Sequence, residues 1–206
     1  MLLLALDTAG PVVSVAVHDG ASVLGSATGE GAMAHGELLA PAIGRALEQA
    51  GAAPGDLTDV AVGVGPGPFT GLRVGVVTAL SLAQTLGLTT HGVCSLDVVE
   101  AGRTGEYLVA IDARRREVYW ARYVDDRRVD GPHVDRPAEL ATRHPGVPVV
   151  GRGALLHADH LRAAEGSDTR LDPSAELLAD AVVGRRVEVL PLEPLYLRRP
   201  DATPAW

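Results

Sequence analysis

Hydrophobic and polar residues alternate along the first thirty positions in the way that β-strands require. An apolar run at 2–7 predicts a buried strand, and Val12 to Val17 alternates with Ser and Ala as a second strand does. A Gly10-Pro11 turn joins the two, and the Asp19-Gly20 pair predicts a hairpin that leads to a third strand at 22–28. The chain thus opens with a three-stranded meander.

The apolar period then changes to 3.6 residues, which indicates helices. A first helix is expected to stop at Gly51, and its apolar stripe comprises Leu39, Ala42, Ile43, Ala46, Leu47 and Ala50. A short strand at 59–65 follows. A second helix is expected from an N-cap at Thr70 to Leu86, with Gly87 as its C-cap. This order of elements is that of an RNase H-like lobe.

The second half repeats this opening. Its expected elements are strands at 107–112 and 117–124, an Asp125-Asp126 turn, a short strand near Val129, helices at 137–143 and 154–164 around a strand at 147–151, and a last helix at 174–183 capped by Ser174. Both halves begin with a strand that ends in aspartate, Asp7 and Asp112. We therefore predict an α/β protein of two RNase H-like lobes facing across a cleft, in a degenerate actin-like ATPase (ASKHA) fold.

The predicted lobes span residues 1–102 and 103–206, and the tail 191–206 is expected to pack back on the first lobe. Asp7 and Asp112 have two readings. Each caps the turn after its strand, or the two form a carboxylate pair across the cleft, and we favour the turn cap for Asp112.

Charge and composition exclude several classes of protein. The chain carries 18 basic and 26 acidic residues, a net charge of −8, so it is a poor RNA binder by itself. Every basic residue is Arg, and neither Lys nor Asn occurs, which removes the lysine of a P-loop or kinase and the asparagine of a kinase catalytic loop. The single cysteine, Cys94, is expected to be a buried, inert thiol.

The apolar start of the chain does not predict a signal peptide. It lacks a basic leader, and Asp7 ends the apolar run early. No segment approaches the roughly 20 apolar residues of a membrane span. We expect a cytoplasmic protein without membrane association.

The most specific motif is Gly65-Pro66-Gly67-Pro68-Phe69-Thr70-Gly71-Leu72-Arg73-Val74-Gly75, at a strand-to-helix turn. Its glycines could let a phosphate approach the helix start, although Pro66 and Pro68 each remove a donor N–H. Alternatively, small residues spaced by four form a ridge for close packing, at Gly71, Gly75, Ala79 and Ala83.

This motif resembles the GPGSFTGLRxG signature of the TsaB family, with Pro68 where the family usually has Ser. Pro68 either stiffens this loop or alters the choice of partner. The resemblance runs along nearly the whole chain, through Leu4-Ala5-Leu6-Asp7-Thr8, His35-Gly36-Glu37-Leu38-Leu39-Ala40-Pro41, Ser95-Leu96-Asp97, Asp112-Ala113-Arg114 with Glu117-Val118-Tyr119, and Pro194-Leu195-Tyr196-Leu197-Arg198. It implies a non-catalytic subunit of the complex that makes threonylcarbamoyladenosine next to the tRNA anticodon, a family once labelled M22 glycoproteases.

The resemblance implies neither a metal nor catalytic residues. TsaD, the catalytic sister subunit, carries an HxxxH metal pair where this chain has Ser95 and Val99. No cofactor is expected, and a vestigial nucleotide cleft would involve Asp7, Thr8, Gly65 and Gly67. The implied partners are TsaD and the ATPase TsaE, with tRNA met only indirectly and a homodimer when the chain is alone. The implied partner surface is His35, Leu38, Leu39, Phe69, Thr70, Leu72, Arg73, Val76, Val77 and Leu80.

Two other functions compete with this reading: an independent actin-like kinase or metallopeptidase, and a generic homodimeric binding module. His157, Asp159 and His160 could contribute to a metal site, because the two histidines would share a helix face. Arg114-Arg115-Arg116 beside a predicted hairpin is either a solvated sheet edge or a contact with RNA or a partner.

Overall fold

The first sheet has the strand order that the meander and the first two helices predicted. The computed structural model describes residues 1–30, 35–166 and 171–198. The sheet order is β3-β2-β1-β4-β5, antiparallel between β1, β2 and β3 and parallel between β1, β4 and β5. These strands are β1 Leu3–Asp7, β2 Val12–His18, β3 Val23–Glu30, β4 Asp59–Gly65 and β5 Thr89–Cys94.

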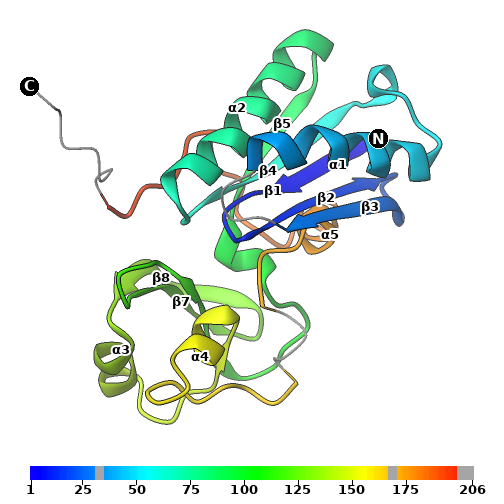
Figure 1. The fold of residues 1–206 in the computed structure, drawn as a ribbon. Helices are drawn as coiled ribbons and strands as arrows, with labels where there is room; N and C mark the ends of the chain where they lie inside the picture. Colours follow the sequence, from blue (N-terminus) through cyan, green and yellow to red (C-terminus); the bar gives the residue numbers. More distant parts are fainter. Residues whose placement is uncertain (31–34, 167–170, 199–206) are drawn as a thin grey trace, which may run out of the picture.

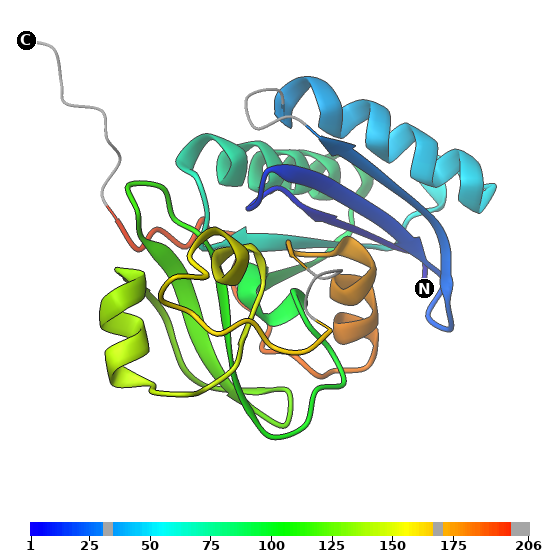
Figure 2. The same cartoon turned by 60° about the horizontal axis from the view of Figure 1, so that its bottom comes forward.

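Helices cover both faces of this sheet (Figure 1, Figure 2). Helices α1 (His35–Ala50) and α2 (Phe69–Leu86) lie on one face, and α5 (Ala175–Val183) lies on the other. The alternation along β1 explains the two cores: Leu4 and Leu6 pack under α1 and α2, while Leu3 and Ala5 pack against α5. Short 3-10 turns occur at η1 (Pro54–Asp56) and η2 (Ser95–Val98).

The second sheet has four strands and repeats the order β3-β2-β1-β4 of the first. Its order is β8-β7-β6-β9, with β6 antiparallel to β7 and parallel to β9, just as β1 is antiparallel to β2 and parallel to β4. Its elements are β6 Glu106–Asp112, β7 Val118–Val124, β8 Arg127–Asp135, α3 Pro137–Arg143, β9 Val149–Val150 and α4 Arg152–Leu156. The predicted pair of lobes in an actin-like fold is therefore confirmed.

Some predicted boundaries were wrong. The helix expected at 154–164 ends at Leu156, because the backbone of residues 162–164 pairs with Val149 at the edge of the second sheet. His157 and His160 consequently lie in a turn and share no helix face. The strand near Val129 extends over all of β8. Pro68, rather than Thr70, is the N-cap of α2.

The end of the described chain contacts the first sheet and the apolar core of the second lobe. Leu190 and Gly92 exchange backbone hydrogen bonds, and Leu195 N–H donates to Val64 O over 2.7 Å. The boundary at residue 102 stays a prediction, although helix α5, which that boundary assigns to the second lobe, packs on the first sheet. The part of the expected tail beyond residue 198 lies outside the described residues.

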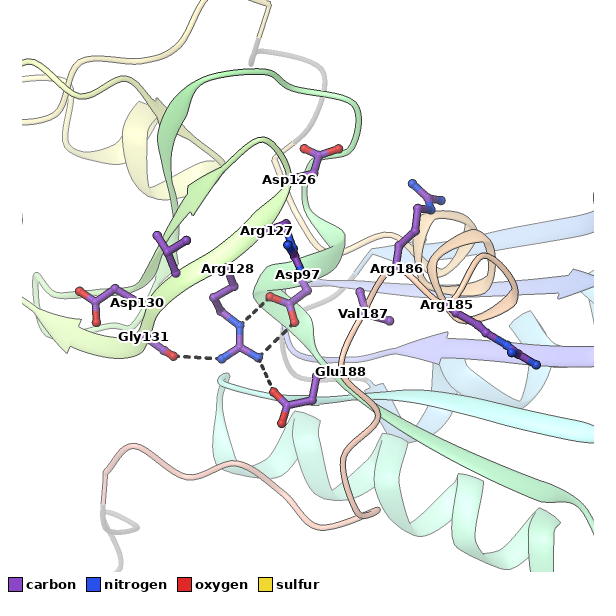
Figure 3. Close-up of a pocket in the computed structure, with 11 residues that line it drawn as sticks. Asp97, Asp126, Arg127, Arg128, Asp130, Gly131, Arg185, Arg186, Val187 and Glu188 are labelled. Atoms are coloured by element: carbon purple, nitrogen blue, oxygen red, sulfur yellow. Dashed lines mark hydrogen bonds and ion pairs between the residues drawn. The ribbon is translucent and has the colours of Figure 1, made fainter.

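A half-buried arginine also connects the two lobes. Arg128 Nε donates to Asp97 Oδ1 over 2.9 Å, linking β8 with η2. Arg128 Nη1 donates to Gly131 O over 2.9 Å, and Arg128 Nη2 lies 3.4 Å from Glu188 Oε2 (Figure 3). The Arg128 side chain is 17% exposed and that of Asp97 is 8% exposed. The two charges are thus paired with each other inside the chain.

Candidate functional site

The first candidate site is the outer face of α1 and α2. The two helices run side by side over the same face of the first sheet (Figure 2). Within α2, the buried residues are Gly71, Leu72, Gly75, Val76 and Ala79. On its outer side, Val77 is 57% exposed and Leu80 is 41% exposed. The helix therefore presents large apolar side chains away from its own sheet.

Four of the ten residues predicted for a partner surface face inwards, so the prediction is wrong for them in this conformation. His35, Leu39, Leu72 and Val76 are at most 6% exposed. A ring nitrogen of His35 lies 2.9 Å from Gly10 O, which ties the start of α1 to the loop after β1. Leu39, Leu72 and Val76 hold their helices against the sheet and contribute no outer surface.

The other six predicted residues are accessible. Leu38 and Phe69 are half-buried, while Thr70, Arg73, Val77 and Leu80 are exposed. Length and composition alone would also allow α2 to cross a membrane. Its buried residues, however, pack on the first sheet.

The glycines of the 65–75 motif serve packing. A Cβ atom on Gly75 would lie 2.4 Å from Thr8 Oγ1, and one on Gly71 would lie 2.5 Å from Thr8 O. Thr8 Oγ1 donates to Gly71 O over 2.8 Å. A Cβ atom on Gly67 would lie 2.6 Å from Ala9 O. The loop after β1 thus occupies the space beside the start of α2 where a phosphate would have to approach.

The second candidate site, the cleft end of β1, is closed. Asp7 and Thr8 are at most 1% exposed, and Gly65 and Gly67 are also buried. Asp7 accepts hydrogen bonds from Ala9 N–H and from Ser95 Oγ, each over 2.7 Å. Burial raises the pKa of Asp7 to about 6, although the hydrogen bond from Ser95 opposes the shift. Asp7, Thr8 and Gly65 are thus closed off in this conformation, whereas Gly67 lines a cavity of about 160 Å³ on the side of Arg114 and Tyr196.

The aspartates at the ends of β1 and β6 cap equivalent turns. Asp7 Oδ1 accepts from the N–H of Ala9, and Asp112 Oδ1 accepts from the N–H of Arg114 over 2.8 Å. In each case the acceptor is two residues before the donor, as in an Asx turn. The turn-cap reading thus describes the local geometry of both aspartates.

A cavity of about 260 Å³ remains between the lobes. His35 and Asp112 line it together with the ion pair between Arg152 and Asp172. Sequence reasoning missed Arg152 and Asp172, which are single polar residues without a motif. Across residues 1–30, 35–166 and 171–198, no three His, Cys, Asp or Glu side chains are grouped closely enough to hold a metal ion.

Comparison with known proteins places the chain in a family. Residues 29–167 match the family model "TsaD: tRNA N6-adenosine threonylcarbamoyltransferase". An uncharacterized protein of Mycobacterium tuberculosis is 43% identical over 98% of this chain and 94% of its own length. The Escherichia coli tRNA threonylcarbamoyladenosine biosynthesis protein TsaB is 37% identical over 61% of this chain and 56% of its own length. The chain belongs to the TsaB family.

A solved structure agrees with this assignment over almost the whole chain. YeaZ from Pseudomonas aeruginosa superposes with a TM-score of 0.79 at 28% sequence identity, covering 95% of this chain and 99% of that one. The TsaB-family signature at 65–75 is the motif whose glycines pack against Thr8 and Ala9. In this family member the signature thus fixes the position of α2 on the sheet.

The positions that match the HxxxH pair of TsaD have structural roles in this TsaB-family chain. Ser95 is fully buried, donates to Asp7 and accepts from Gly65 N–H over 3.2 Å. Val99 is 1% exposed and belongs to the core of the second lobe. Both side chains thus stabilise the folded structure, Ser95 by hydrogen bonds and Val99 by apolar packing.

The raised pKa of Asp7 predicts a pH-dependent stability. Between about pH 4 and about pH 6, the Asp7 carboxyl keeps its proton in the native state but has lost it in the unfolded chain. The free energy of unfolding contributed by Asp7 therefore falls as the pH rises through this window. Asn keeps the acceptor for Ala9 N–H without a charge, so Asp7→Asn should remove this fall, worth up to about 3 kcal/mol at pH 7.

Urea unfolding at several pH values between 4 and 7 measures this effect. As a second variant, Ser95→Ala removes a hydrogen bond that lowers the pKa of Asp7, so it should move the fall in stability to higher pH. Parallel pH profiles for the parent protein and Asp7→Asn would contradict the prediction.

Proposed function

We propose that this chain is the non-catalytic subunit of the complex that forms N6-threonylcarbamoyladenosine in tRNA, and that it supports a TsaD-type catalytic subunit. The observation that carries the proposal is the exposure of Val77 and Leu80 on a helix whose other side packs on its own sheet. An exposed apolar surface of this kind is typical of a protein–protein contact. The TsaB name of a relative that is 37% identical supports the same process.

The proposed contact surface is the accessible part of the two helices. Val77 and Leu80 are its exposed large apolar side chains, and Leu38, Phe69, Thr70 and Arg73 complete it. When the catalytic subunit is absent, a second copy of this chain covers the same face, because a symmetric dimer buries one self-complementary patch on both copies. The homodimer and the heterodimer therefore compete for one surface.

The chain itself performs no step, since Ser95 and Val99 supply no imidazole where TsaD has its metal pair. The transfer of threonylcarbamoyl takes place on the TsaD-type subunit, a TsaE-type ATPase joins the complex, and the assembly works in the cytoplasm. No cofactor is held by this chain.

Co-purification and activity test this proposal together. The tagged chain should retain the TsaD-type subunit of the same organism. Threonylcarbamoyladenosine should form in unmodified tRNA only when the TsaD-type and TsaE-type subunits are present with this chain and threonylcarbamoyl-adenylate. Alone, the chain should show no modification activity, no peptidase activity and no stoichiometric metal by elemental analysis. A bound metal whose removal abolished an activity of the isolated chain would instead favour the independent enzyme.

A further inference from the structure

Three consecutive arginines have a backbone conformation that arginine rarely adopts. Arg114, Arg115 and Arg116 have φ angles of 60°, 54° and 61°. They form the turn between β6 and β7, which is closed by a 3.0 Å hydrogen bond from Glu117 N–H to Arg114 O. Positive φ at both central residues is typical of type I′ hairpin turns, where Asn-Gly is the favoured pair. Arginine at these positions strains the backbone.

The next hairpin of the same sheet provides the contrast. Its central residues are Asp125 and Asp126, with φ angles of 48° and 61°, and Asp tolerates this conformation better than Arg does. The β6–β7 turn therefore keeps arginine where stability alone would favour Asn or Gly. Strained residues of this kind occur preferentially at functional sites. We expect the three side chains to have a role outside the fold.

More arginines and aromatic rings surround this turn. A cavity of about 160 Å³ lies beside it, lined by Phe69, Arg114, Arg115, Tyr119, Tyr196 and Arg198 among others. Phe69 and Tyr196 stack with their centroids 5.0 Å apart. Arg73 extends the same surface, since its guanidinium lies 3.9 Å from the centre of the Phe69 ring and its Nε donates to Tyr196 Oη over 3.2 Å. Arginine and aromatic side chains thus form one continuous patch.

This arginine–aromatic patch concentrates arginines in a chain whose net charge is −8. It contains five of the 18 arginines: Arg73, Arg114, Arg115, Arg116 and Arg198. Two acidic side chains contact it: Asp112, 3.7 Å from Arg114 Nε, and Glu117, which pairs with Arg198. The Arg114 side chain is 64% exposed, and Arg115 and Arg116 are exposed as well.

We infer that the arginine–aromatic patch binds the phosphates of a single-stranded segment of the RNA substrate. Proteins that hold single-stranded nucleic acid combine arginines along the backbone with aromatic rings on which bases stack, and Tyr196 is 38% exposed beside the arginines. The patch shares Phe69 and Arg73, at the start of α2, with the proposed partner face, while Arg114, Arg115 and Arg116 lie outside that face in the turn between β6 and β7. This inference rests on the proposed function. The sequence predicted that this chain meets tRNA only indirectly. The patch instead makes a weak direct contact that adds to the RNA affinity of the assembled complex.

The test measures RNA binding by the assembled complex of this chain with its TsaD-type partner. The probe is a fluorescein-labelled 17-nucleotide anticodon stem-loop RNA, followed by anisotropy between 50 and 300 mM KCl. In the variant Arg114→Asn, Arg115→Asn, Arg116→Asn, the turn keeps residues that tolerate positive φ, and three charges disappear. The plot of log affinity against log salt concentration should become less steep by about 2, because each of three lost phosphate contacts contributes about 0.7 to its slope. The affinity at 50 mM KCl should fall at least about tenfold.

A matched control removes the same charge elsewhere. Arg127, Arg185 and Arg186 line a charged cavity at the other end of β7, and Arg185 also has a positive φ of 51° (Figure 3). Strand β7 has 7 residues and so separates the two sites by about 20 Å. The triple Asn variant at these positions should bind the RNA within about twofold of the parent. Replacing Arg114, Arg115 and Arg116 by Lys should keep most of the affinity, because phosphate attraction needs the charge.

The outcomes separate this inference from the proposed function. Unchanged RNA affinity in the Asn variant of the turn, or an equal loss in the control, overturns the inference while the complex still forms. Loss of a protein subunit with unchanged RNA affinity shows a docking surface for an acidic protein and also overturns it. If the parent chain retains no TsaD-type partner, the proposed function fails, and the same salt series on the chain alone at high concentration decides the inference.

Discussion

Val77→Glu should abolish both self-association and binding of the TsaD-type subunit. Val77 is 57% exposed in the isolated chain, so a glutamate there stays hydrated and the fold should not change. In the assembled state the same carboxylate would be buried against apolar residues without a partner. We expect at least about a 30-fold loss of affinity, corresponding to about 2 kcal/mol. Light scattering should report a monomer, and circular dichroism should report an unchanged helix content.

A matched substitution serves as the control. Val189 is 55% exposed and lies outside the two helices, so Val189→Glu introduces the same charge at nearly the same exposure. It should leave assembly intact. Leu80→Glu, at 41% exposure on the same face, should act like Val77→Glu. Normal binding by folded Val77→Glu and Leu80→Glu would show that another surface holds the partner.

Most elements of the fold could be predicted because local signals agreed with tertiary packing. The C-caps Gly51 and Gly87, with φ angles of 64° and 71°, ended α1 and α2 where the sequence predicted. The segment 154–164 was the exception. Its apolar spacing suits a helix, yet residues 162–164 pair with Val149 and extend the second sheet. A pairing between residues this far apart leaves no local pattern in the sequence.

The partner face was harder to predict than the fold. Apolar residues surround α2 almost completely, so periodicity could not say which side packs on the sheet. The rotation of the helix is set by Gly71 and Gly75, which lie against Thr8. Their four-residue spacing was recognised as a packing ridge, but its target was unknown. With Gly75 inwards, Leu72 and Val76 turn inwards too, and Val77 is left outside.

Two Gly→Ala substitutions within helices should have opposite effects, because only one of the two glycines belongs to the packing ridge. Gly44 in α1 has no atom within 4 Å of an added Cβ, so Gly44→Ala should stabilise the protein by about 1 kcal/mol through helix propensity. An added Cβ on Gly75 would lie 2.4 Å from Thr8 Oγ1 and 3.5 Å from Val62 Cγ2. Thr8 is fully buried and cannot move aside easily. We expect Gly75→Ala to destabilise the protein by about 2 kcal/mol despite its better propensity.

A double-mutant cycle assigns the effect to this contact. Thr8→Ala removes Oγ1, so it should cost less stability in the Gly75→Ala background than in the parent, with a coupling free energy of about 1 kcal/mol or more. Urea midpoints and slopes of the four proteins supply the numbers. Gly75→Ala should also weaken partner binding, because α2 must shift outwards and carry Val77 with it. If Gly75→Ala were as stable as Gly44→Ala, α2 would not rest on Thr8, and the inward side of the helix would have to be reassigned.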